Sequence, residues 1–331
     1  MFPRMPTCLI VQPIHQDAVS HLRQQGVKVV SPDVPDQATL LRLAADVDAV
    51  ITRNTGIPAD AVADSARLRV IAVHGIGTDA VPVDLATERC VVVINTPDAN
   101  LQSVAEHAWG LLLAVAKRVP SADRATRDGD FTFKFRSPSR ELSGGTLGLL
   151  GFGKIAKRVA AMAPAFGVHV VAMSPNQPDE AFRACGVERV PDLRTLLARA
   201  DFLSVHVPLS AATRALVGAA ELALLRGDAI IVNTSRGAVI DEMALAAWLS
   251  ANPDAGAGLD VFSSEPPPLD HPLLALSNAV LSPHTAASSD AALRRMGMEV
   301  AEGVLAVLDG RLPLNVVNPT VLGRLQRLAT S

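Results

Sequence analysis

Short runs of apolar, mostly β-branched residues alternate along the chain with longer segments in which apolar residues recur at helical spacing. The short runs are bounded by Gly, Pro or Asn and are apolar at nearly every position, which is typical of strands buried on both faces of a parallel sheet. The pattern predicts strands at Cys8–Val11, Val27–Val30, Ala49–Thr52, Leu68–Val73, Val91–Asn95, Leu147–Gly151, Val168–Met173, Phe202–Val207, Ala229–Asn233, Gly256–Val261 and Ala279–Ser282.

The alternation of strands with helical segments predicts parallel βαβ units and therefore an α/β protein. The chain has 331 residues, more than one hydrophobic core usually holds, so we expect two doubly wound parallel-sheet domains. A helical stretch after Asp290 and the segment NVVNP extend beyond the last predicted strand. We therefore expect the chain to return to its first domain, which gives a discontinuous domain of residues 1–99 and 289–331 and a second domain of residues 100–288.

Three segments carry signals for the start of a helix. VPDQATLL from Val34 and VPDLRTLL from Val190 share an opening, which an internal duplication and a shared amphipathic design explain equally well. Ser103 to Glu106 has the spacing of a capping box, and the apolar segment after it predicts a helix that continues to Lys117. We expect that helix to connect the two domains.

Phenylalanine recurs at every second position in DFTFKFRS, at Phe131, Phe133 and Phe135. In an extended segment these three rings would lie on one face. A second subunit could cover such an apolar face, and the alternative is a cover from within the same chain.

Composition excludes several classes of partner. Lys and Arg number 30 against 33 Asp and Glu, with a net charge of −3 and no long block of one sign, so neither nucleic acid nor a membrane surface is expected as a partner. No apolar run approaches the ~20 residues of a membrane span, and the N-terminus lacks the apolar core of a secretory signal. Three scattered cysteines argue against a disulfide framework. We expect a cytoplasmic protein.

The histidines and the missing tyrosines narrow the chemistry. Eight histidines occur, but none falls into a compact ligand spacing, so no metal site is expected. The chain has no tyrosine, so proton transfer must use His, Asp, Glu or Lys.

A phosphate-binding turn is predicted in TLGLLGFGKIAKRVA, where a buried strand runs into G-x-G-x-x-A and then a helix. Gly151 permits the tight turn, Gly153 lets the backbone approach a pyrophosphate, and Ala156 keeps helix and strand close. Because the glycines stand in the required strand-turn-helix context, this motif indicates a dinucleotide site.

The residue that would face the adenosine ribose does not reveal the coenzyme. A carboxylate normally stands at the end of the second strand of such a unit, but this chain has Ser174 there and no acid before Asp179. Serine removes the charge that would repel a 2′-phosphate, yet we expect no arginine beside it to attract one. NAD and NADP both remain possible cofactors.

Several ionisable residues follow neighbouring predicted strands. Arg236, Asp260, Glu265 and His284 stand after three of these strands, and ligands of an open parallel sheet bind beyond the carboxyl ends of its strands. A guanidinium can hold a carboxylate, an imidazolium can protonate a ketone oxygen, and a nearby carboxylate keeps that ring charged and oriented. The alternatives are a strand-end histidine, a solvated loop acid and an exposed turn arginine.

The first domain offers a second group of candidates. After the strand LRVIAV, the turn HGIGTD contains Gly75 and Gly77, whose flanking amides could form a nest for a substrate carboxylate. Arg53 follows another strand and could reach the rest of the substrate. Ordinary turn chemistry is the alternative for all three.

Taken together, these motifs resemble the D-isomer-specific 2-hydroxyacid dehydrogenases, a family that includes D-3-phosphoglycerate dehydrogenase and glyoxylate/hydroxypyruvate reductases. The resemblance covers nearly the whole chain and rests on HGIGTDAVPVD, NTPDANLQSVAEHAWGLLLA, ELSGGTLGLLGFGKIAKRVA, HVPLSAAT, NTSRGAVIDE, AGLDVFSSEPP and SPHTAAS. It implies a Rossmann cofactor domain, a flavodoxin-like substrate domain and a homodimer. It implies that Arg236, Glu265 and His284 are catalytic, with His284 as the acid/base.

The same resemblance implies the ligand contacts. The implied cofactor-binding residues are Gly151, Phe152, Gly153, Lys154, Ile155, Ser174, His206, Val207, Pro208, Thr213, Thr234 and Asp260. The implied substrate-binding residues are Arg53, Gly75, Ile76 and Gly77. Ser174 departs from the usual aspartate, Ala287 from a common glycine and Gly145 from a frequent lysine. We expect no added regulatory domain.

Three hypotheses follow. The first is an NAD(P)-dependent oxidoreductase that interconverts a small unphosphorylated 2-oxo acid and its D-2-hydroxy acid in a cleft that closes between the domains. The second is a dinucleotide-sensing, corepressor-like binding protein on the same fold. The third, formate dehydrogenase, needs no acid/base proton transfer, so the pair of Glu265 and His284 argues against it.

Overall fold

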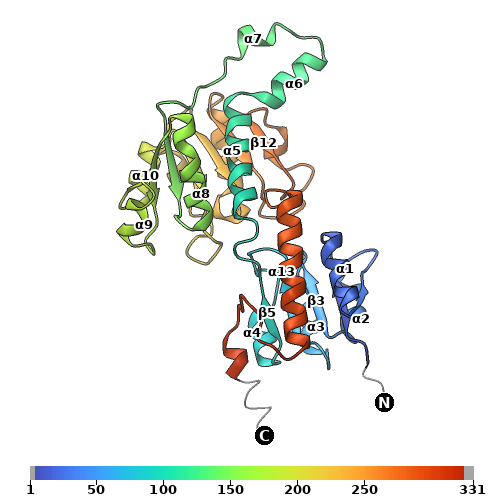
Figure 1. Ribbon diagram of the computed structural model, residues 1–331. Coiled ribbons are helices and arrows are strands. Elements are labelled where there is room, and N and C mark those ends of the chain that lie inside the picture. The colour runs from blue at the N-terminus through green and yellow to red at the C-terminus, as the bar shows by residue number, and fades with distance from the viewer. Residues whose placement is uncertain (1–3, 324–331) are drawn as a thin grey trace. The chain divides into compact units, whose positions relative to one another are not determined.

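The computed structural model describes residues 4–323 and divides the chain into two compact units. The first unit consists of residues 4–100 and 287–323, and the second of residues 101–286. Each is an α/β unit built on one parallel sheet (Figure 1).

The first unit contains a five-stranded parallel sheet in the order β2-β1-β3-β4-β5. Its strands are β1 (Thr7–Ile10), β2 (Lys28–Val30), β3 (Ala49–Thr52), β4 (Val70–Val73) and β5 (Val92–Ile94). Its helices are α1 (Gln16–Gln24), α2 (Gln37–Ala44), α3 (Ala59–Ala63), α4 (Val83–Glu88) and α13 (Asp290–Leu308).

Successive strand residues of the first unit point into two separate cores. Cys8 and Ile10 pack with side chains of α1 and α13, whereas Leu9 packs with side chains of α2, α3 and α4. Both faces of the sheet are therefore covered, which explains why its strands are apolar at nearly every position. The long helix α13, far away in sequence, lies beside α1 (Figure 1).

The second unit contains a seven-stranded parallel sheet in the order β12-β11-β10-β9-β6-β7-β8. Its strands are β6 (Thr146–Leu150), β7 (His169–Met173), β8 (Glu188–Arg189), β9 (Phe202–Val205), β10 (Ile230–Asn233), β11 (Gly256–Leu259) and β12 (Ala279–Leu281). Its helices are α5 (Leu101–Ala116), α6 (Val119–Arg127), α7 (Phe133–Arg136), α8 (Lys154–Met162), η1 (Ala163–Phe166), α9 (Asp179–Arg183), α10 (Leu193–Arg199), α11 (Ala219–Leu222), η2 (Gly237–Val239), α12 (Glu242–Ala251) and η3 (Pro272–Ala275).

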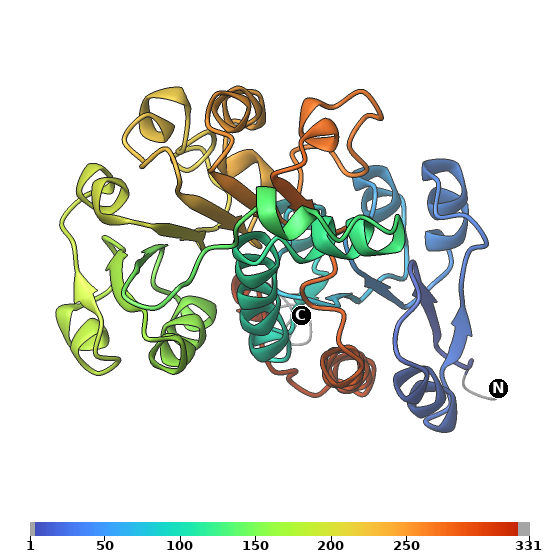
Figure 2. The same ribbon diagram turned by 90° about the horizontal axis from the view of Figure 1, so that it is seen from above.

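Helices cover both faces of this sheet as well, as Figure 2 shows. Leu149 and Val170 pack with side chains of α5 and α8, whereas Leu150 and Val171 pack with side chains of α10, α11 and α12. The doubly wound α/β architecture predicted for both parts of the chain is therefore confirmed.

Every strand predicted from the sequence occurs, with ends that differ by at most two residues. The two-residue strand β8 was not predicted, because Glu188 and Arg189 are both charged. The helix predicted from Ser103 begins at Leu101 instead, and the Ser103 hydroxyl donates to the Ala286 carbonyl at 2.7 Å rather than capping the helix.

The repeated VPD opening has a local cause. Asp36 accepts a hydrogen bond from the Thr39 amide at the start of α2, and Asp192 does the same for Thr195 at the start of α10. Aspartate at this position satisfies an amide that the first turn of a helix leaves without a partner. The two segments therefore share a helix N-cap.

The prediction that Phe131, Phe133 and Phe135 line one face of an extended segment is wrong. Phe133 begins the short helix α7, and an ion pair between Asp130 and Arg136 closes this turn. Helical geometry places residues two apart on different sides. Phe131 is 68% exposed and Phe135 is 81% exposed.

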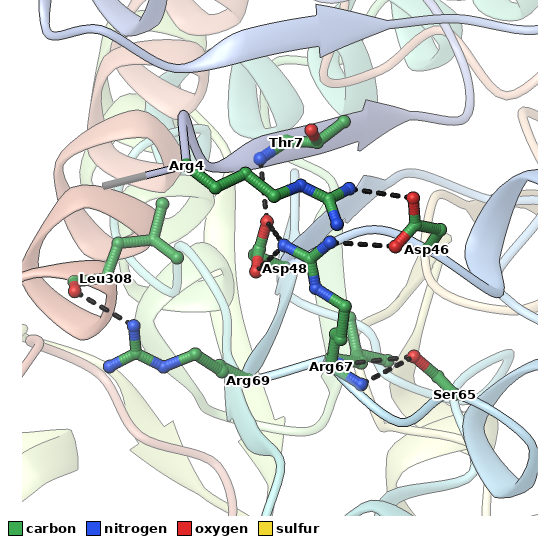
Figure 3. Close-up of polar contacts among 9 residues, drawn as sticks. Arg4, Thr7, Asp46, Asp48, Ser65, Arg67, Arg69 and Leu308 are labelled. Carbon is green, nitrogen blue, oxygen red and sulfur yellow. Dashed lines mark hydrogen bonds and ion pairs between the residues drawn. The ribbon is translucent and has the colours of Figure 1, made fainter. Parts of the chain in front are cut away.

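A cluster of arginines and aspartates ties together the amino ends of the first unit's strands (Figure 3). The Arg67 guanidinium bonds the Asp48 carboxylate at 2.6 Å and the Asp46 carboxylate at 2.7 Å. Asp48 also accepts from the Thr7 amide at 2.8 Å, and Arg69 donates to the Leu308 carbonyl at the end of α13. These contacts fix the loops at the amino ends of the strands, whereas the predicted substrate turn lies at the carboxyl end of β4.

Candidate functional site

The predicted phosphate-binding turn joins β6 to α8. Gly151 has φ +95°, and a Cβ atom there would lie 2.9 Å from the His206 carbonyl carbon, so only glycine fits. Ala156 is completely buried against the sheet. These two small residues let α8 begin directly at the carboxyl end of β6.

The start of α8 fits a dinucleotide diphosphate. Gly153 is the N-cap residue, and a Cβ atom added to it would meet nothing within 4 Å, so the backbone borders open space. No side chain of the described residues caps this helix. Its first amides and the positive end of its dipole are therefore suited to hold an anion.

The other residues predicted around this turn lie at the carboxyl ends of β6 and β9. The Phe152 ring is buried and stacks on Phe182 with centroids 4.5 Å apart, so it contributes to the core and leaves only its backbone for a ligand. After β9, the His206 ring contacts the Ser204 hydroxyl at 2.8 Å. Thr213 donates to the Pro208 carbonyl at 2.6 Å and so fixes the segment that begins with Val207.

An arginine does stand beside Ser174, contrary to the sequence interpretation. Arg189 lies on β8, next to β7, and its Nη2 donates to the Ser174 carbonyl at 3.5 Å. The same guanidinium pairs with Asp179 and lowers the pKa of that carboxyl. The contact between Arg189 and Ser174 exists because β8 lies beside β7. Since 15 residues separate the two in the sequence, no local motif could reveal this contact.

Arg236 follows β10 on a closely packed turn. The Asn233 side chain donates to the Arg236 carbonyl at 2.9 Å, and the Arg236 guanidinium contacts the Ser235 carbonyl at 2.8 Å. At Gly237 a Cβ atom would lie 2.0 Å from the Phe262 carbonyl carbon. The backbone at Arg236 is thereby held against the segment that leads to Glu265.

Thr234 lies beside this turn, and its buried hydroxyl has no hydrogen-bond partner among the described residues. A buried polar atom without a partner is costly and calls for an explanation, such as a ligand group. A cofactor amide would supply the missing partner.

Asp260 follows β11 and is completely buried. Its carboxylate accepts from the Ser282 hydroxyl at 2.6 Å and from the Thr285 and Ala286 amides at 2.8 Å each. Burial raises the pKa of this carboxyl, but hydrogen bonds from His107, Ser282 and these amides lower it further, so the net shift is downward. Asp260 therefore organises the 282–286 loop, and the predicted nicotinamide contact of this residue stays a prediction.

His107, on α5, was not predicted as part of this cluster. Its Nε2 lies 2.9 Å from the Ser282 hydroxyl and 3.3 Å from the Asp260 carboxylate. Because the Ser282 proton is directed to Asp260, His107 Nε2 must donate. The segment SVAEHAWG offers only apolar helical spacing as a signal.

His284 follows β12 and pairs with Glu265, with 2.7 Å between its Nδ1 and Glu265 Oε2. The His284 backbone has φ +54°, and its amide donates to the Asp260 carbonyl at 2.8 Å. A left-handed backbone at a non-glycine residue is strained and is often found at functional sites. The loop built on Asp260 maintains this conformation.

The Glu265 carboxylate is oriented from both sides. Its Oε1 accepts from the Phe262 amide at 3.1 Å. Burial raises the pKa of Glu265, while the hydrogen bonds from His284 and Phe262 lower it more, so the net shift is downward although the Asp260 charge opposes it. The Glu265 carboxyl therefore stays ionised at and above the ordinary glutamate pKa and takes up a proton only as the pH falls through its lowered pKa.

The predicted substrate turn of the first unit follows β4. The Gly75 carbonyl accepts from the Thr96 amide at 2.9 Å, and the Ile76 carbonyl accepts from the Asn95 side chain at 2.8 Å. Gly77 completes this turn. Arg53 is half-buried and donates to the Pro13 carbonyl at 3.0 Å.

His74, which precedes this turn, is only 5% exposed. Its Nε2 contacts the Leu293 carbonyl at 3.3 Å, and a carbonyl can only accept, so Nε2 carries the proton. Burial, together with the charge of Arg53, lowers the pKa of His74 from 6.5 to about 4. The ring is therefore neutral in the folded protein at neutral pH.

We predict that the first unit loses stability as the pH falls from 6.5 towards 4. The unfolded chain takes up a proton on His74 in this range and the folded chain does not, so the free energy of unfolding falls by about 2 kcal/mol between pH 8 and pH 5. Urea unfolding followed by far-ultraviolet circular dichroism measures this change. His74→Gln should flatten the pH dependence, and an equal slope in both proteins would contradict the assignment.

Residues 4–323 contain neither a candidate metal site nor a candidate membrane span. No group of three or more His, Cys, Asp or Glu within residues 4–323 is arranged to hold a metal ion. Across the same part of the chain, no helix has the length and apolarity needed to cross a membrane.

Comparison with known proteins identifies relatives along nearly the whole chain. The family described as D-isomer specific 2-hydroxyacid dehydrogenase, NAD binding domain, matches residues 109–286. D-3-Phosphoglycerate dehydrogenase from Methanocaldococcus jannaschii is 40% identical over 315 residues, which are 95% of this chain and 60% of that protein. Glyoxylate reductase from Aeropyrum pernix is 39% identical over 296 residues, 87% of this chain and 88% of that enzyme. This chain thus spans about 60% of the length of the phosphoglycerate dehydrogenase it matches.

Solved structures agree with these relatives. NADPH-dependent glyoxylate/hydroxypyruvate reductase from Sinorhizobium meliloti, in complex with NADP and malonate, has a TM-score of 0.84 and 30% identity, and the match covers 96% of this chain and 98% of that one. A protein from Thermus thermophilus has a TM-score of 0.87 and 34% identity, with 94% and 99% of the two chains covered.

Proposed function

The chain belongs to the D-isomer-specific 2-hydroxyacid dehydrogenase family, and from this membership we propose that it is an NAD(P)-dependent oxidoreductase that interconverts a small 2-oxo acid and its D-2-hydroxy acid. The observation that carries the proposal is the 2.7 Å contact between His284 and Glu265. This pair stands at the carboxyl end of the sheet that also bears the glycine turn.

Each residue has a distinct task in the proposed reaction. The turn at Gly151 and Gly153 and the start of α8 would hold the diphosphate of a dinucleotide, whose nicotinamide supplies or accepts the hydride. Protonated His284 donates its Nε2 proton to the carbonyl oxygen as negative charge develops there, and Glu265 stabilises the charged ring from Nδ1.

Two further groups complete the proposed substrate site. Arg236 binds the substrate carboxylate and the reacting oxygen through its planar guanidinium. In the first unit, Arg53 and the turn of Gly75, Ile76 and Gly77 are the proposed substrate-binding residues. A homodimer is also part of the proposal, with a second copy of the chain covering Phe131 and Phe135.

We propose that NADP(H) is accepted at least as well as NAD(H). Ser174 places no negative charge beside the ribose, and Arg189 brings a cation to the same strand end. Asp179 neutralises part of that cation, but a 2′-phosphate carries more charge and can compete for the guanidinium.

A panel of 2-oxo acids with both reduced coenzymes tests the function. We expect glyoxylate and hydroxypyruvate to be reduced with NADPH, read as loss of coenzyme absorbance, and phosphohydroxypyruvate to react more slowly because Arg53 is the one extra cation proposed for that site. Coenzyme binding without turnover of any acid would reject the oxidoreductase and favour a dinucleotide-sensing protein.

The coenzyme assignment has its own control. Arg189→Leu should weaken binding of 2′,5′-ADP about tenfold while binding of 5′-ADP is unchanged, because only the former carries a 2′-phosphate. Arg183→Leu is the matched variant, since Arg183 pairs with Glu180 within helix α9. Equal losses for both nucleotides would contradict a role in 2′-phosphate recognition.

A further inference from the structure

Glu242 is a buried carboxylate that no step proposed above uses. It is the first residue of α12 and is 9% exposed. The N-cap of α12 is the preceding Asp241, which accepts from the Met243 and Ala244 amides. Glu242 is therefore not needed to cap its own helix, and its burial requires another explanation.

Three hydrogen-bond donors from one loop converge on Glu242. The Ser263 amide and the Ser263 hydroxyl each donate at 2.6 Å. His271 Nε2 lies 3.2 Å from the same carboxylate. Because His271 Nδ1 accepts from the Leu273 amide, Nε2 carries the proton and donates. Only a group without donors of its own satisfies all three, which selects a carboxylate over an amide at position 242.

The bonded loop carries the partner of the proposed acid/base. Ser263 follows Phe262, and the Phe262 amide donates to Glu265 Oε1 at 3.1 Å, while Glu265 Oε2 contacts His284. Gly237 packs against the same Phe262–Ser263 peptide, next to Arg236. A shift of this peptide would therefore move the carboxylate that orients His284.

We propose that Glu242 is a positioning residue for the Glu265–His284 pair and acts through the Phe262–Ser263 peptide. The effect of Glu242 on catalysis rests on the proposed function, whereas its effect on the position of Glu265 and His284 does not. Asp260 is a further charged group that acts on Glu265, and the substitution leaves the contacts of Asp260 in place.

Glu242→Gln tests the proposal because it keeps size and removes the acceptor that faces His271 and the Ser263 hydroxyl. We expect kcat to fall on the order of 10- to 100-fold with the coenzyme KM within about twofold, since a misplaced proton donor affects the chemical step and not dinucleotide binding. The proton resonance of the His284 ring, assigned with His284→Gln, should titrate with a midpoint lower by about 0.5 pH unit or more.

The controls separate positioning from simple loss of stability. Glu221→Gln removes a carboxylate that bonds the Gly218 amide at the start of α11, away from this loop, and should change neither kcat nor the His284 titration. Ser263→Ala keeps the amide donor and removes the hydroxyl, so it should give a smaller change in the same direction, and it decides the question if Glu242→Gln fails to fold.

An unchanged His284 titration in both variants overturns the inference. A shifted titration in a chain that reduces no 2-oxo acid leaves the positioning role intact and rejects the proposed function instead. The two failures are therefore distinguishable.

Discussion

Replacement of His284 by alanine is expected to lower turnover by about 10²- to 10⁴-fold in the reduction of the 2-oxo acid, the usual contribution of a positioned general acid or base. The ring is the group paired with Glu265 at 2.7 Å, and its left-handed backbone is held by the loop on Asp260. Steady-state kinetics at saturating coenzyme measure the loss. Dinucleotide affinity, measured by calorimetry, should be unchanged because the glycine turn is untouched.

The surface of the same unit provides a matched control. His169 pairs with Glu188 at 3.3 Å, and both side chains are about half exposed. His169→Ala therefore removes a histidine–glutamate pair without touching the site and should leave turnover within about twofold. Turnover of His284→Ala close to that of the native chain would remove the basis of the proposed mechanism.

Most of the strands were predictable because they are buried on both faces. Runs such as Val70–Val73 are apolar throughout, and the two cores on either side of each sheet require that pattern. The exception, β8, consists of Glu188 and Arg189 at the edge of the sheet, where side chains face solvent. The strand β8 carries no apolar signal, so periodicity cannot find it, whereas the edge strands β2, β5 and β12 keep an apolar run and were predicted.

The positions of the candidate site residues were easier to predict than their contacts. Arg236, Asp260 and His284 follow adjacent strands, so parallel topology alone places them at one sheet edge. The donors to Asp260 come from residues 282–286, which fold back onto this carboxylate. The spacing of residues in the sequence does not predict the conformation of that loop. The same holds for Glu242 and Ser263, which are 21 residues apart.

The misassigned phenylalanines show the limit of a two-residue period. Three alternating rings suggest a strand, but Asp130 bonds the Thr132 amide and pairs with Arg136, which together favour a helical turn over the same residues. These local side-chain contacts favour the helix α7 over the extended strand that the apolar pattern suggested.

Replacement of Arg236 by glutamine is expected to lower kcat/KM for the 2-oxo acid on the order of 10²- to 10³-fold. Removal of one partner from a desolvated, hydrogen-bonded charge pair costs about 2 to 5 kcal/mol, and the substrate carboxylate would lose that partner. Arg236→Lys should recover only part of the loss, because an ammonium keeps the charge but cannot form two parallel hydrogen bonds.

Arg226→Gln serves as the comparison, because Arg226 is an exposed arginine of the same unit that pairs with Asp228 at 3.1 Å. It should leave kcat/KM unchanged, whereas both Arg236 variants should raise KM for the acid and leave coenzyme affinity as it is. Since Gly237 holds this backbone against Phe262, the substitutions change the side chain while the turn stays in place. If Arg236→Lys were as active as the native chain, a point charge would suffice and the bidentate contact assigned to the guanidinium would be wrong; if Arg236→Gln were equally active, the carboxylate would have to be bound elsewhere.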